Sequence, residues 1–317
     1  MTINNLRKNV LIIGGSGFIG KNLIDKYIEQ GYYVLNYDKV PYETYTQNSI
    51  ENFNASSEAQ DFEKIFSSYE IDHIVYLINT VHPSYKMDME IEKKIEENIV
   101  FPIRIIDFAN KKGINKIIYF SSGGAVYGNY KNKFSEHDKL EPITFYGITK
   151  KIVENYLVEN KKNNDLDFLI LRPSNPYGKY QNILNNQGII AIIINKILKS
   201  EPVEIWGSPE ILRDYINIED LTKIYFEILQ RGYKNEIFNI ASGKASSVSE
   251  IISTFERILN KKIETKLIPM ENLIKVNSLD TSKIELFYSS DKFKSLEEGI
   301  RNMLKEYKLL DIKETNE

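Results

Sequence analysis

Residues 9–20 read Asn-Val-Leu-Ile-Ile-Gly-Gly-Ser-Gly-Phe-Ile-Gly, and this stretch decides the fold class. The apolar run from Asn9 to Ile13 predicts a buried strand, and the pattern from Phe18 to Gln30 predicts a helix. Glycine between them permits the tight turn that joins a strand directly to a helix. A strand, a glycine turn and a helix in this order form the first unit of an alternating α/β fold.

The glycines fit two spacings, GxGxxG from Gly15 and GxxGxxG from Gly14. Such a turn lets the backbone approach a pyrophosphate, which then meets the unpaired N–H groups at the helix N-terminus. Asp38 follows at the end of the next apolar run, 18 residues after Gly20. A carboxylate there accepts hydrogen bonds from ribose hydroxyls and repels a 2′-phosphate. This favours NAD over NADP, although Lys39 beside it weakens the preference, and a glycine turn without a ligand is the alternative.

The first half of the chain continues the alternation of strands and helices. Strands are expected at Tyr33 to Tyr37, His73 to Ile78, Ile117 to Ser121 and Phe168 to Leu171, and helices at Glu58 to Ser67, Glu90 to Lys112 (kinked at Pro102) and Tyr146 to Lys161. Strands this short and apolar are typical of a sheet covered by helices on both faces. We therefore predict an α/β fold with a Rossmann-type doubly wound parallel sheet.

After Arg172 the pattern loosens. Residues Asn175 to Asn186 resemble a loop, with helices expected at Gln187 to Lys199, Glu219 to Gln230, Ser249 to Leu259 and Ser295 to Tyr307, and strands at Val203 to Trp206 and Ile237 to Ile240. We interpret this region as a smaller, discontinuous C-terminal substrate-binding lobe. The expected division is 1–173 plus about 214–240 for the NAD-binding domain, and about 174–213 plus 241–317 for the substrate-binding lobe.

Composition narrows the chemistry. The 317 residues include no cysteine and three histidines, His73, His82 and His137, which are not spaced as metal ligands. Forty-one basic against 44 acidic residues give no electropositive surface for nucleic acid. No apolar run reaches the ~18 residues of a membrane span, and no signal-peptide pattern opens the chain. We expect a cytoplasmic protein without metal, nucleic-acid or membrane partners.

A tyrosine and a lysine four residues apart stand out among the remaining reactive groups. Tyr146 and Lys150 share one face of the helix predicted over Tyr146 to Lys161. A phenol is a poor base at neutral pH, but a nearby ammonium stabilises the phenolate. The phenolate could then take the proton of a sugar hydroxyl as hydride leaves the same carbon. YxxxK alone is a common match; its position one strand after Ser121-Ser122-Gly-Gly-Ala-Val-Tyr-Gly gives it weight.

Together these motifs resemble the extended short-chain dehydrogenase/reductase family, and within it the nucleotide-sugar epimerase/dehydratase group. The resemblance extends to about Asp280. Within the group, the chain is similar to the UDP-glucose 4-epimerase-like proteins of bacterial polysaccharide pathways. The segments that carry it, in chain order, are GGSGFIG (14–20), Asp38, SSGGAVYG (121–128), YGITK (146–150), LRPSNPYG (171–178), GSPEILRDYINIEDL (207–221) and FNIASG (238–243).

The resemblance implies roles for individual residues. Tyr146 falls on the catalytic base, Lys150 on the lysine that assists it and holds the nicotinamide ribose, and Ser122 beside the hydroxyl that orients the sugar. The implied NAD contacts are Gly14, Gly17, Phe18, Ile19, Asp38, Lys39, Asn54, Ala55, Leu77, Ile78, Asn79, Asn98, Lys150 and Pro173. The implied substrate contacts are Ser122, Tyr146, Asn175, Gln187, Trp206 and Arg213. Arg213 would clamp the diphosphate of a nucleotide-diphosphate sugar. Trp206 could equally belong to the core. Arg172 also falls inside a motif, and two interpretations stay open for it: a role in the site, or no more than the anchoring of a strand end.

Three positions depart from the family pattern. Gly123 stands where the family places its catalytic serine or threonine, so Ser122 would have to take that role. An arginine of the C-terminal lobe is absent, with Met270 near its place. Asn277 stands near the position that limits space at the sugar C2.

The resemblance implies an NAD-dependent 4-epimerase acting on a UDP-hexose or UDP-N-acetylhexosamine. A 4,6-dehydratase needs an acid and a base where this chain has Gly124 and Ala125, whereas an epimerase needs only one base and a bound NAD. The alternatives are a nucleotide-4-keto-6-deoxysugar reductase that uses NAD(P)H and a non-catalytic dinucleotide-sensing protein. A homodimer is expected, as in the family, through the helices at Glu90 to Lys112 and Tyr146 to Lys161.

Overall fold

The computed structural model describes residues 7–43, 47–55, 59–81, 90–114, 116–185, 187–269 and 276–310. The chain divides into two compact units. The first comprises Met1–Val126, Pro142–Arg172 and Ile228–Phe238, and the second Tyr127–Glu141, Pro173–Glu227 and Asn239–Glu317. These units differ from the expected division mainly at 127–141 and 214–227, which lie in the second unit.

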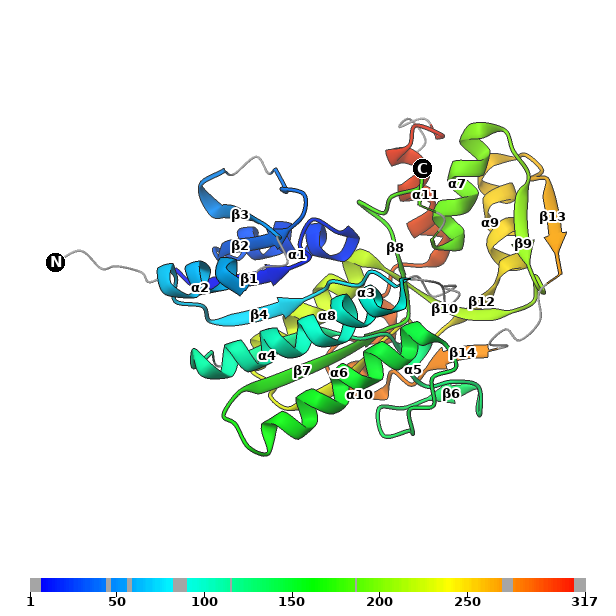
Figure 1. Ribbon diagram of the computed structural model, residues 1–317. Coiled ribbons are helices and arrows are strands. Elements are labelled where there is room, and N and C mark those ends of the chain that lie inside the picture. Colours follow the sequence, from blue (N-terminus) through cyan, green and yellow to red (C-terminus); the bar gives the residue numbers. More distant parts are fainter. Residues whose placement is uncertain are drawn as a thin grey trace. The chain divides into compact units, whose positions relative to one another are not determined.

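A seven-stranded parallel sheet organises the first unit (Figure 1). Its order is β11-β7-β5-β4-β1-β2-β3. The strands are β1 (Asn9–Ile13), β2 (Tyr33–Asp38), β3 (Ile50–Asn54), β4 (His73–Tyr76), β5 (Lys116–Phe120), β7 (Asp167–Pro173) and β11 (Glu236–Ile240). The sequence moves outward from β1 to β3 and then crosses to β4, which is the Rossmann topology. The predicted fold class is confirmed.

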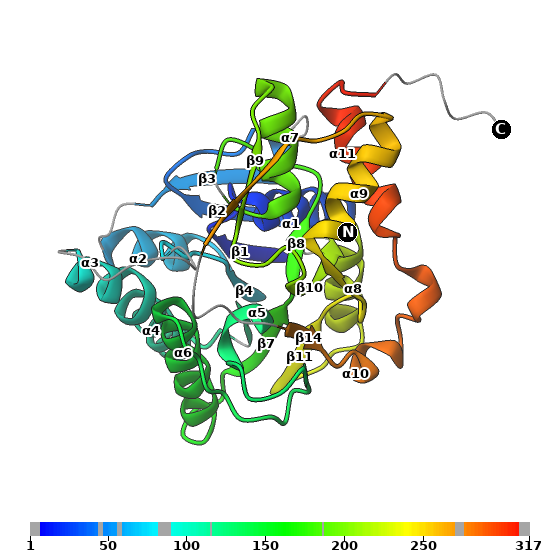
Figure 2. The ribbon, with the colours of Figure 1, turned by 90° about the vertical axis from the view of Figure 1, so that its right-hand side faces the viewer.

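Alternating side chains of these strands pack under helices. The helices of this unit are α1 (Phe18–Glu29), α2 (Ala59–Ser68), α3 (Ile91–Ile95), α4 (Phe101–Lys111), α5 (Gly123–Val126) and α6 (Phe145–Lys161). Leu11 and Ile13 of β1 point into the cluster beneath α2, α4 and α6, whereas the intervening Ile12 points to the other face. Figure 2 shows α4 and α6 side by side, and Asn110 Nδ2 donates to Asn160 Oδ1 between them at 2.9 Å.

The strand β3 was not predicted from the sequence. It pairs in parallel with β2, with Val34 opposite Ile50. Only Ile50 of its five residues is buried, because β3 is the edge strand and faces solvent along most of its length. An edge strand therefore lacks the continuous apolar run by which the inner strands were recognised.

The predicted kink at Pro102 takes the form of a widened turn. A π-helical turn, Glu96–Val100, joins α3 to α4, and Pro102 lies in the first turn of α4. Proline lacks the N–H of a regular helix, and its ring would collide with the carbonyl four residues earlier, at Asn98. The wider turn accommodates this defect.

The second unit contains smaller sheets and a helical core. Its elements are β6 (Lys133–Phe134), β8 (Asn175–Tyr177), α7 (Ile189–Lys199), β9 (Val203–Trp206), β10 (Leu212–Asn217), α8 (Ile218–Gln230, which continues into the first unit), β12 (Ala245–Ser247), α9 (Val248–Leu259), β13 (Thr265–Ile268), β14 (Val276–Leu279), α10 (Ser282–Glu285) and α11 (Leu296–Glu306). The order β12-β10-β14-β6 forms one sheet, with β8 on β10, and β13 pairs with β9. The expected loop at Asn175 to Asn186 is wrong at its start, because Asn175–Tyr177 forms β8 and hydrogen-bonds with β10.

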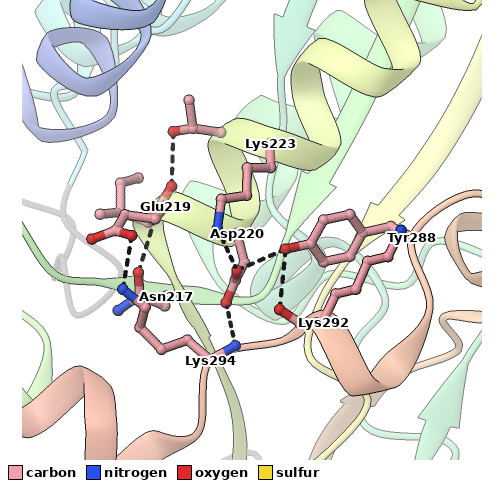
Figure 3. Close-up of polar contacts among 9 residues, drawn as sticks. Asn217, Glu219, Asp220, Lys223, Tyr288, Lys292 and Lys294 are labelled. Atoms are coloured by element: carbon pink, nitrogen blue, oxygen red, sulfur yellow. Dashed lines mark hydrogen bonds and ion pairs between the residues drawn. The ribbon is translucent and has the colours of Figure 1, made fainter.

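A polar network fixes the C-terminal region to the start of α8 (Figure 3). The buried Asp220 carboxylate accepts from the Tyr288 hydroxyl at 2.8 Å and from the Lys294 backbone N–H at 2.8 Å. Lys294 Nζ also pairs with Glu219 at 2.7 Å. The Asn217 side chain caps α8 by accepting from the Glu219 N–H at 2.9 Å. One carboxylate thus joins residues 288–294 to α8.

Tyr288→Phe should lower the free energy of unfolding by about 1 kcal/mol, because a buried carboxylate oxygen loses a donor. Urea denaturation measures the change. The matched control is Tyr130→Phe, whose half-exposed hydroxyl donates to Lys139 O at 2.7 Å and whose loss should cost less than about 0.5 kcal/mol. Equal costs for the two variants would show that the Asp220 network contributes no more than a surface contact.

Candidate active site

The glycine turn after β1 has no room for a side chain at Gly14, Gly15 or Gly20. Gly14 has φ +87°, and a Cβ there would lie 2.9 Å from Ile78 Cγ1. A Cβ on Gly15 would lie 2.3 Å from Asn36 Oδ1, and one on Gly20 would lie 2.4 Å from Gly15 O. The turn itself therefore needs Gly14, and the approach of α1 to the turn needs Gly15 and Gly20, whereas a Cβ on Gly17 would make only an ordinary contact, 3.4 Å from Gly14 O.

The start of α1 presents backbone donors. Gly17 is the N-cap residue and supplies no side-chain cap, so the N–H groups of the first turn, including Phe18 and Ile19, are not satisfied by the cap residue. Peptide dipoles add positive potential at this end of the twelve-residue helix. A helix end of this kind suits an anionic pyrophosphate.

Asp38 lies against the glycine turn. Its Oδ2 accepts from the Ser16 N–H at 3.0 Å, and its Oδ1 accepts from the Val40 N–H at 3.3 Å. The neighbouring edge strand brings Asn54 opposite Asp38, and the Ala55 N–H donates to Asp38 O at 2.9 Å. Four expected NAD contacts thus meet at the carboxyl ends of β2 and β3: Asp38, the exposed Lys39, Asn54 and Ala55.

The segment after β4 completes this side of the unit. The Leu77 N–H donates to Ile13 O at 2.8 Å, which continues the β1–β4 pairing, and Ile78 lies beneath Gly14. Asn79 donates to Val81 O at 2.7 Å. The buried Asn98 accepts from the Thr80 N–H at 2.9 Å and donates to Thr80 Oγ1 at 2.7 Å. Asn98 therefore fixes this loop.

These features fit a dinucleotide. The turn excludes Cβ atoms, the helix end offers N–H groups, and a carboxylate ends the second strand. The glycine turn, Asp38 and Leu77 all follow strands of one parallel sheet, so they share its carboxyl edge.

Ser122 and Tyr146 meet in the first unit. Ser122 follows β5 and precedes α5, and Tyr146 lies in the first turn of α6, where the Thr144 side chain caps the helix by accepting from the Gly147 N–H at 3.1 Å. Burial raises the pKa of the Tyr146 phenol, and a hydrogen bond from Ser122 opposes that rise. Gly123, which aligns with the family hydroxyl, is the first residue of α5, and the serine before it supplies the hydroxyl next to the phenol.

Lys150 lies one helical turn from Tyr146 and is buried. Its Nζ donates to Phe120 O at 2.9 Å and lies 5.9 Å from the centre of the Tyr146 ring and 4.9 Å from that of Tyr119. Burial lowers the pKa of Lys150 to about 7, and the negative charge of Glu154 opposes this fall. The amine therefore changes charge near neutral pH.

Sequence reasoning missed Glu154 and left Arg172 open. The two side chains form a buried ion pair, with Arg172 Nη2 2.6 Å from Glu154 Oε2. Arg172 therefore anchors the end of β7, as one of the two interpretations held. Glu154 follows Lys150 by the same four-residue step that separates Lys150 from Tyr146, and that step was the signal available in the sequence.

The other expected substrate residues, apart from Ser122 and Tyr146, belong to the second unit. Pro173, at the end of β7, opens one of the three segments of that unit. Asn175 Nδ2 donates to Asp214 O at 2.7 Å, and Asn175 on β8 pairs with Tyr215 on β10. Asn175 therefore lies near Arg213, which is also on β10. Burial lowers the pKa of the Arg213 guanidinium, which donates to Leu212 O at 2.8 Å.

Two other expected contacts lie at the surface of this unit. Trp206 is 58% exposed at the end of β9, so its interpretation as a core residue is wrong. Gln187 is exposed and precedes α7. Met270, His82 and the side chain of Asn277 lie outside the described residues. Within the described ranges, no cluster of three His, Asp or Glu side chains is placed to hold a metal ion, and no helix has the length and apolar character to cross a membrane.

Comparison with known proteins now identifies the family. A model of the NAD dependent epimerase/dehydratase family matches residues 10–241. The chain belongs to this family. The expected family and the expected cofactor, NAD, are thereby confirmed.

Relatives in this epimerase/dehydratase family carry different activities. The dTDP-4-dehydro-6-deoxyglucose reductase of Escherichia coli is 37% identical over 81% of this chain and 84% of its own length. A putative UDP-glucose 4-epimerase of Methanocaldococcus jannaschii is 32% identical over 76% and 79%. The UDP-glucose 4-epimerase structure of Thermotoga maritima, solved with UDP-glucose, is 27% identical and superimposes with a TM-score of 0.84 over 95% of this chain and 99% of that one.

Gly147→Ala tests how α6 is placed against α5. A Cβ at Gly147 would lie 2.3 Å from Ala125 O and 2.8 Å from Pro142 Cβ, so α6 must shift away and carry Tyr146 with it. We expect a loss of about 1–3 kcal/mol in the free energy of unfolding, measured by urea denaturation. Asn155→Ala, at an exposed position of the same helix, is the control and should change stability by less than about 0.5 kcal/mol. An alanine variant as stable as the parent protein would contradict the close packing.

Proposed function

We propose that the protein is an NAD-dependent 4-epimerase of a nucleotide-diphosphate hexose, such as a UDP-hexose or a UDP-N-acetylhexosamine. The observation that carries the proposal is the buried Lys150 amine, one helical turn from Tyr146 and 5.9 Å from the centre of its ring, and Ser122 lowers the pKa of the same phenol. The glycine turn and Asp38 supply a dinucleotide site in the same unit.

Each side chain has a defined task in this proposal. The glycine turn and Asp38 would hold NAD, which would supply the acceptor for the hydride of the sugar C4 and the source of its return. The Tyr146 phenolate takes the proton of the C4 hydroxyl and later gives a proton back to the C4 oxygen. Ser122 donates a hydrogen bond that steadies the phenolate, and the Lys150 ammonium stabilises its negative charge. Return of the hydride to the opposite face, after the 4-keto sugar has rotated, inverts C4.

The substrate phosphates are assigned to the second unit. Arg213 is proposed to bind the diphosphate, because a guanidinium can donate to two phosphate oxygens at once. Asn175, Gln187 and Trp206 are proposed to contact the nucleotide sugar as well. A homodimer is also part of the proposal, and Ile148 and Ile152 on α6 expose apolar side chains for such a contact.

A second candidate is a nucleotide-4-keto-6-deoxysugar reductase. It is favoured by the 37% identity to the dTDP-4-dehydro-6-deoxyglucose reductase of Escherichia coli. The two reactions share the proton transfer at Tyr146 and differ in the balance of hydride. An epimerase returns the hydride to the same sugar, whereas a reductase consumes one NAD(P)H for each sugar reduced.

A panel of nucleotide sugars separates the two. With UDP-glucose and UDP-N-acetylglucosamine, an epimerase forms the galacto epimer without net change in absorbance at 340 nm. With dTDP-4-dehydro-6-deoxyglucose and NADH or NADPH, a reductase oxidises the cofactor in proportion to product. We expect the first result; stoichiometric cofactor oxidation with no epimer would establish the second candidate, and no turnover with any substrate would refute both.

Tyr146→Phe should reduce kcat by about 10²–10⁴-fold, because the base is removed while the ring is kept. Tyr156→Phe is the control, since its hydroxyl lies on the same helix and hydrogen-bonds with Asp107. Both variants should keep the far-UV circular dichroism spectrum of the parent. Full activity of the Tyr146 variant would exclude it as the base.

A further inference from the structure

A buried carboxylate lies one helical turn beyond the proposed catalytic lysine. Glu154 follows Lys150 on α6 and is 2% exposed, as is its partner Arg172 on β7. A carboxylate and a guanidinium removed from water cost free energy unless each is paired and hydrogen-bonded. The proposed chemistry uses neither group directly, so their burial beside the reactive lysine calls for an explanation.

The Glu154 carboxylate is held from two strands. Arg172 Nε donates to Oε1 at 3.1 Å and to Oε2 at 3.2 Å, and Arg172 Nη2 donates to Oε2 at 2.6 Å. The hydroxyl of Ser121 donates to Oε1. Ser121 directly follows Phe120, whose carbonyl accepts from Lys150 Nζ, and it directly precedes Ser122. Phe120, Ser121 and Ser122 are thus three consecutive residues that hydrogen-bond with three side chains of α6. Their partners are Lys150, Glu154 and Tyr146, respectively.

We propose that Glu154, held by Arg172 and Ser121, is a positioning residue that keeps the Lys150 amine in its charged form beside Tyr146. This inference rests on the proposed function, in which the ammonium stabilises the phenolate. In that proposed function Glu154 touches neither substrate nor cofactor, and it acts through Lys150 alone.

The groups around Lys150 explain why a carboxylate is needed. Tyr119 faces it from β5, Tyr146 and Glu154 lie on its own helix, and Arg172 approaches Glu154 from β7. The Phe120 carbonyl is neutral, and burial favours the uncharged amine. Glu154 opposes that effect. Without it, Lys150 and Arg172 would be two buried cations, and Lys150, whose pKa is already near neutral, would release its proton.

The test follows the Lys150 amine directly in the full-length protein as purified. NMR of protein labelled with 13C at lysine Cε reports the charge of each amine, and the Lys150 resonance is the one that disappears in Lys150→Met. In the parent its midpoint should lie near neutral pH, far from the ordinary lysine value near 10.4. In Glu154→Gln the midpoint should fall by roughly one to three pH units, as expected for loss of an adjacent opposite charge.

A matched control lies on the same helix. Glu159→Gln removes an exposed carboxylate that pairs with Lys162 at 2.5 Å, and it should leave the Lys150 midpoint and kcat unchanged. For Glu154→Gln we expect kcat to fall about tenfold or more at neutral pH while KM for the nucleotide sugar is kept. A Lys150 midpoint that is the same in folded Glu154→Gln as in the parent would overturn the proposal and leave Glu154 a structural brace.

A second variant covers the case in which Glu154→Gln fails to fold because Arg172 is left unpaired. Glu154→Gln/Arg172→Met removes both buried charges, and its Lys150 midpoint should also lie below that of the parent. An unchanged midpoint there would again overturn the proposal. Because the titration requires no turnover, it gives its answer even if the sugar panel refutes the proposed function.

Discussion

The first unit depends on the close approach of α1 to the turn after β1. Any side chain at Gly20 would collide with the backbone of Gly15, and any side chain at Gly15 would collide with Asn36 on the neighbouring strand. This contact seats the helix directly on the end of the sheet, and its N-terminal N–H groups therefore face the carboxyl edge. The positions of Asp38, of the β4 loop and of the β5 end follow from the parallel order of the same sheet.

Burial acts on the reactive groups in a direction opposite to their proposed use. It raises the pKa of the Tyr146 phenol and lowers that of the Lys150 amine, so that both favour their neutral forms. The hydrogen bond from Ser122 and the charge of Glu154 counter these two effects separately. In the unfolded chain Lys150 would titrate near 10.5, and its lowered pKa means that the folded state loses stability as pH falls from there to about 7. The fold therefore sustains a cost at neutral pH in order to keep these groups in a dry site.

The sequence predicted the inner strands and their helices well, because burial on both faces leaves continuous apolar runs. β1 was predicted with its observed bounds, and α1 differs by one residue. β3 was missed because it is only partly buried, and β8 because it is also short. The π-helical turn before Pro102 could be anticipated only as a kink, since the sequence does not show how the helix absorbs the missing hydrogen bond.

The site was predictable where motif spacing fixes geometry, as for Tyr146 and Lys150. Glu154 escaped notice because a glutamate on a helix is usually solvated, and only the arrival of Arg172 from β7 explains its burial. The same limit applied to Ser122, because whether its hydroxyl replaces the one that is absent at Gly123 depends on where the turn into α5 directs it.

The path of the chain between the two units has a practical meaning for anyone who wishes to re-engineer the protein. The polypeptide passes from one unit to the other after residues 126, 141, 172, 227 and 238. Two of these passages, after residues 126 and 141, lie between Ser122 and Tyr146. Neither unit is a contiguous stretch that could be excised or exchanged by a single splice. A chimaera that borrows the second unit of a relative would have to transplant three separate pieces and rejoin five junctions, two of them within some twenty residues of the proposed base.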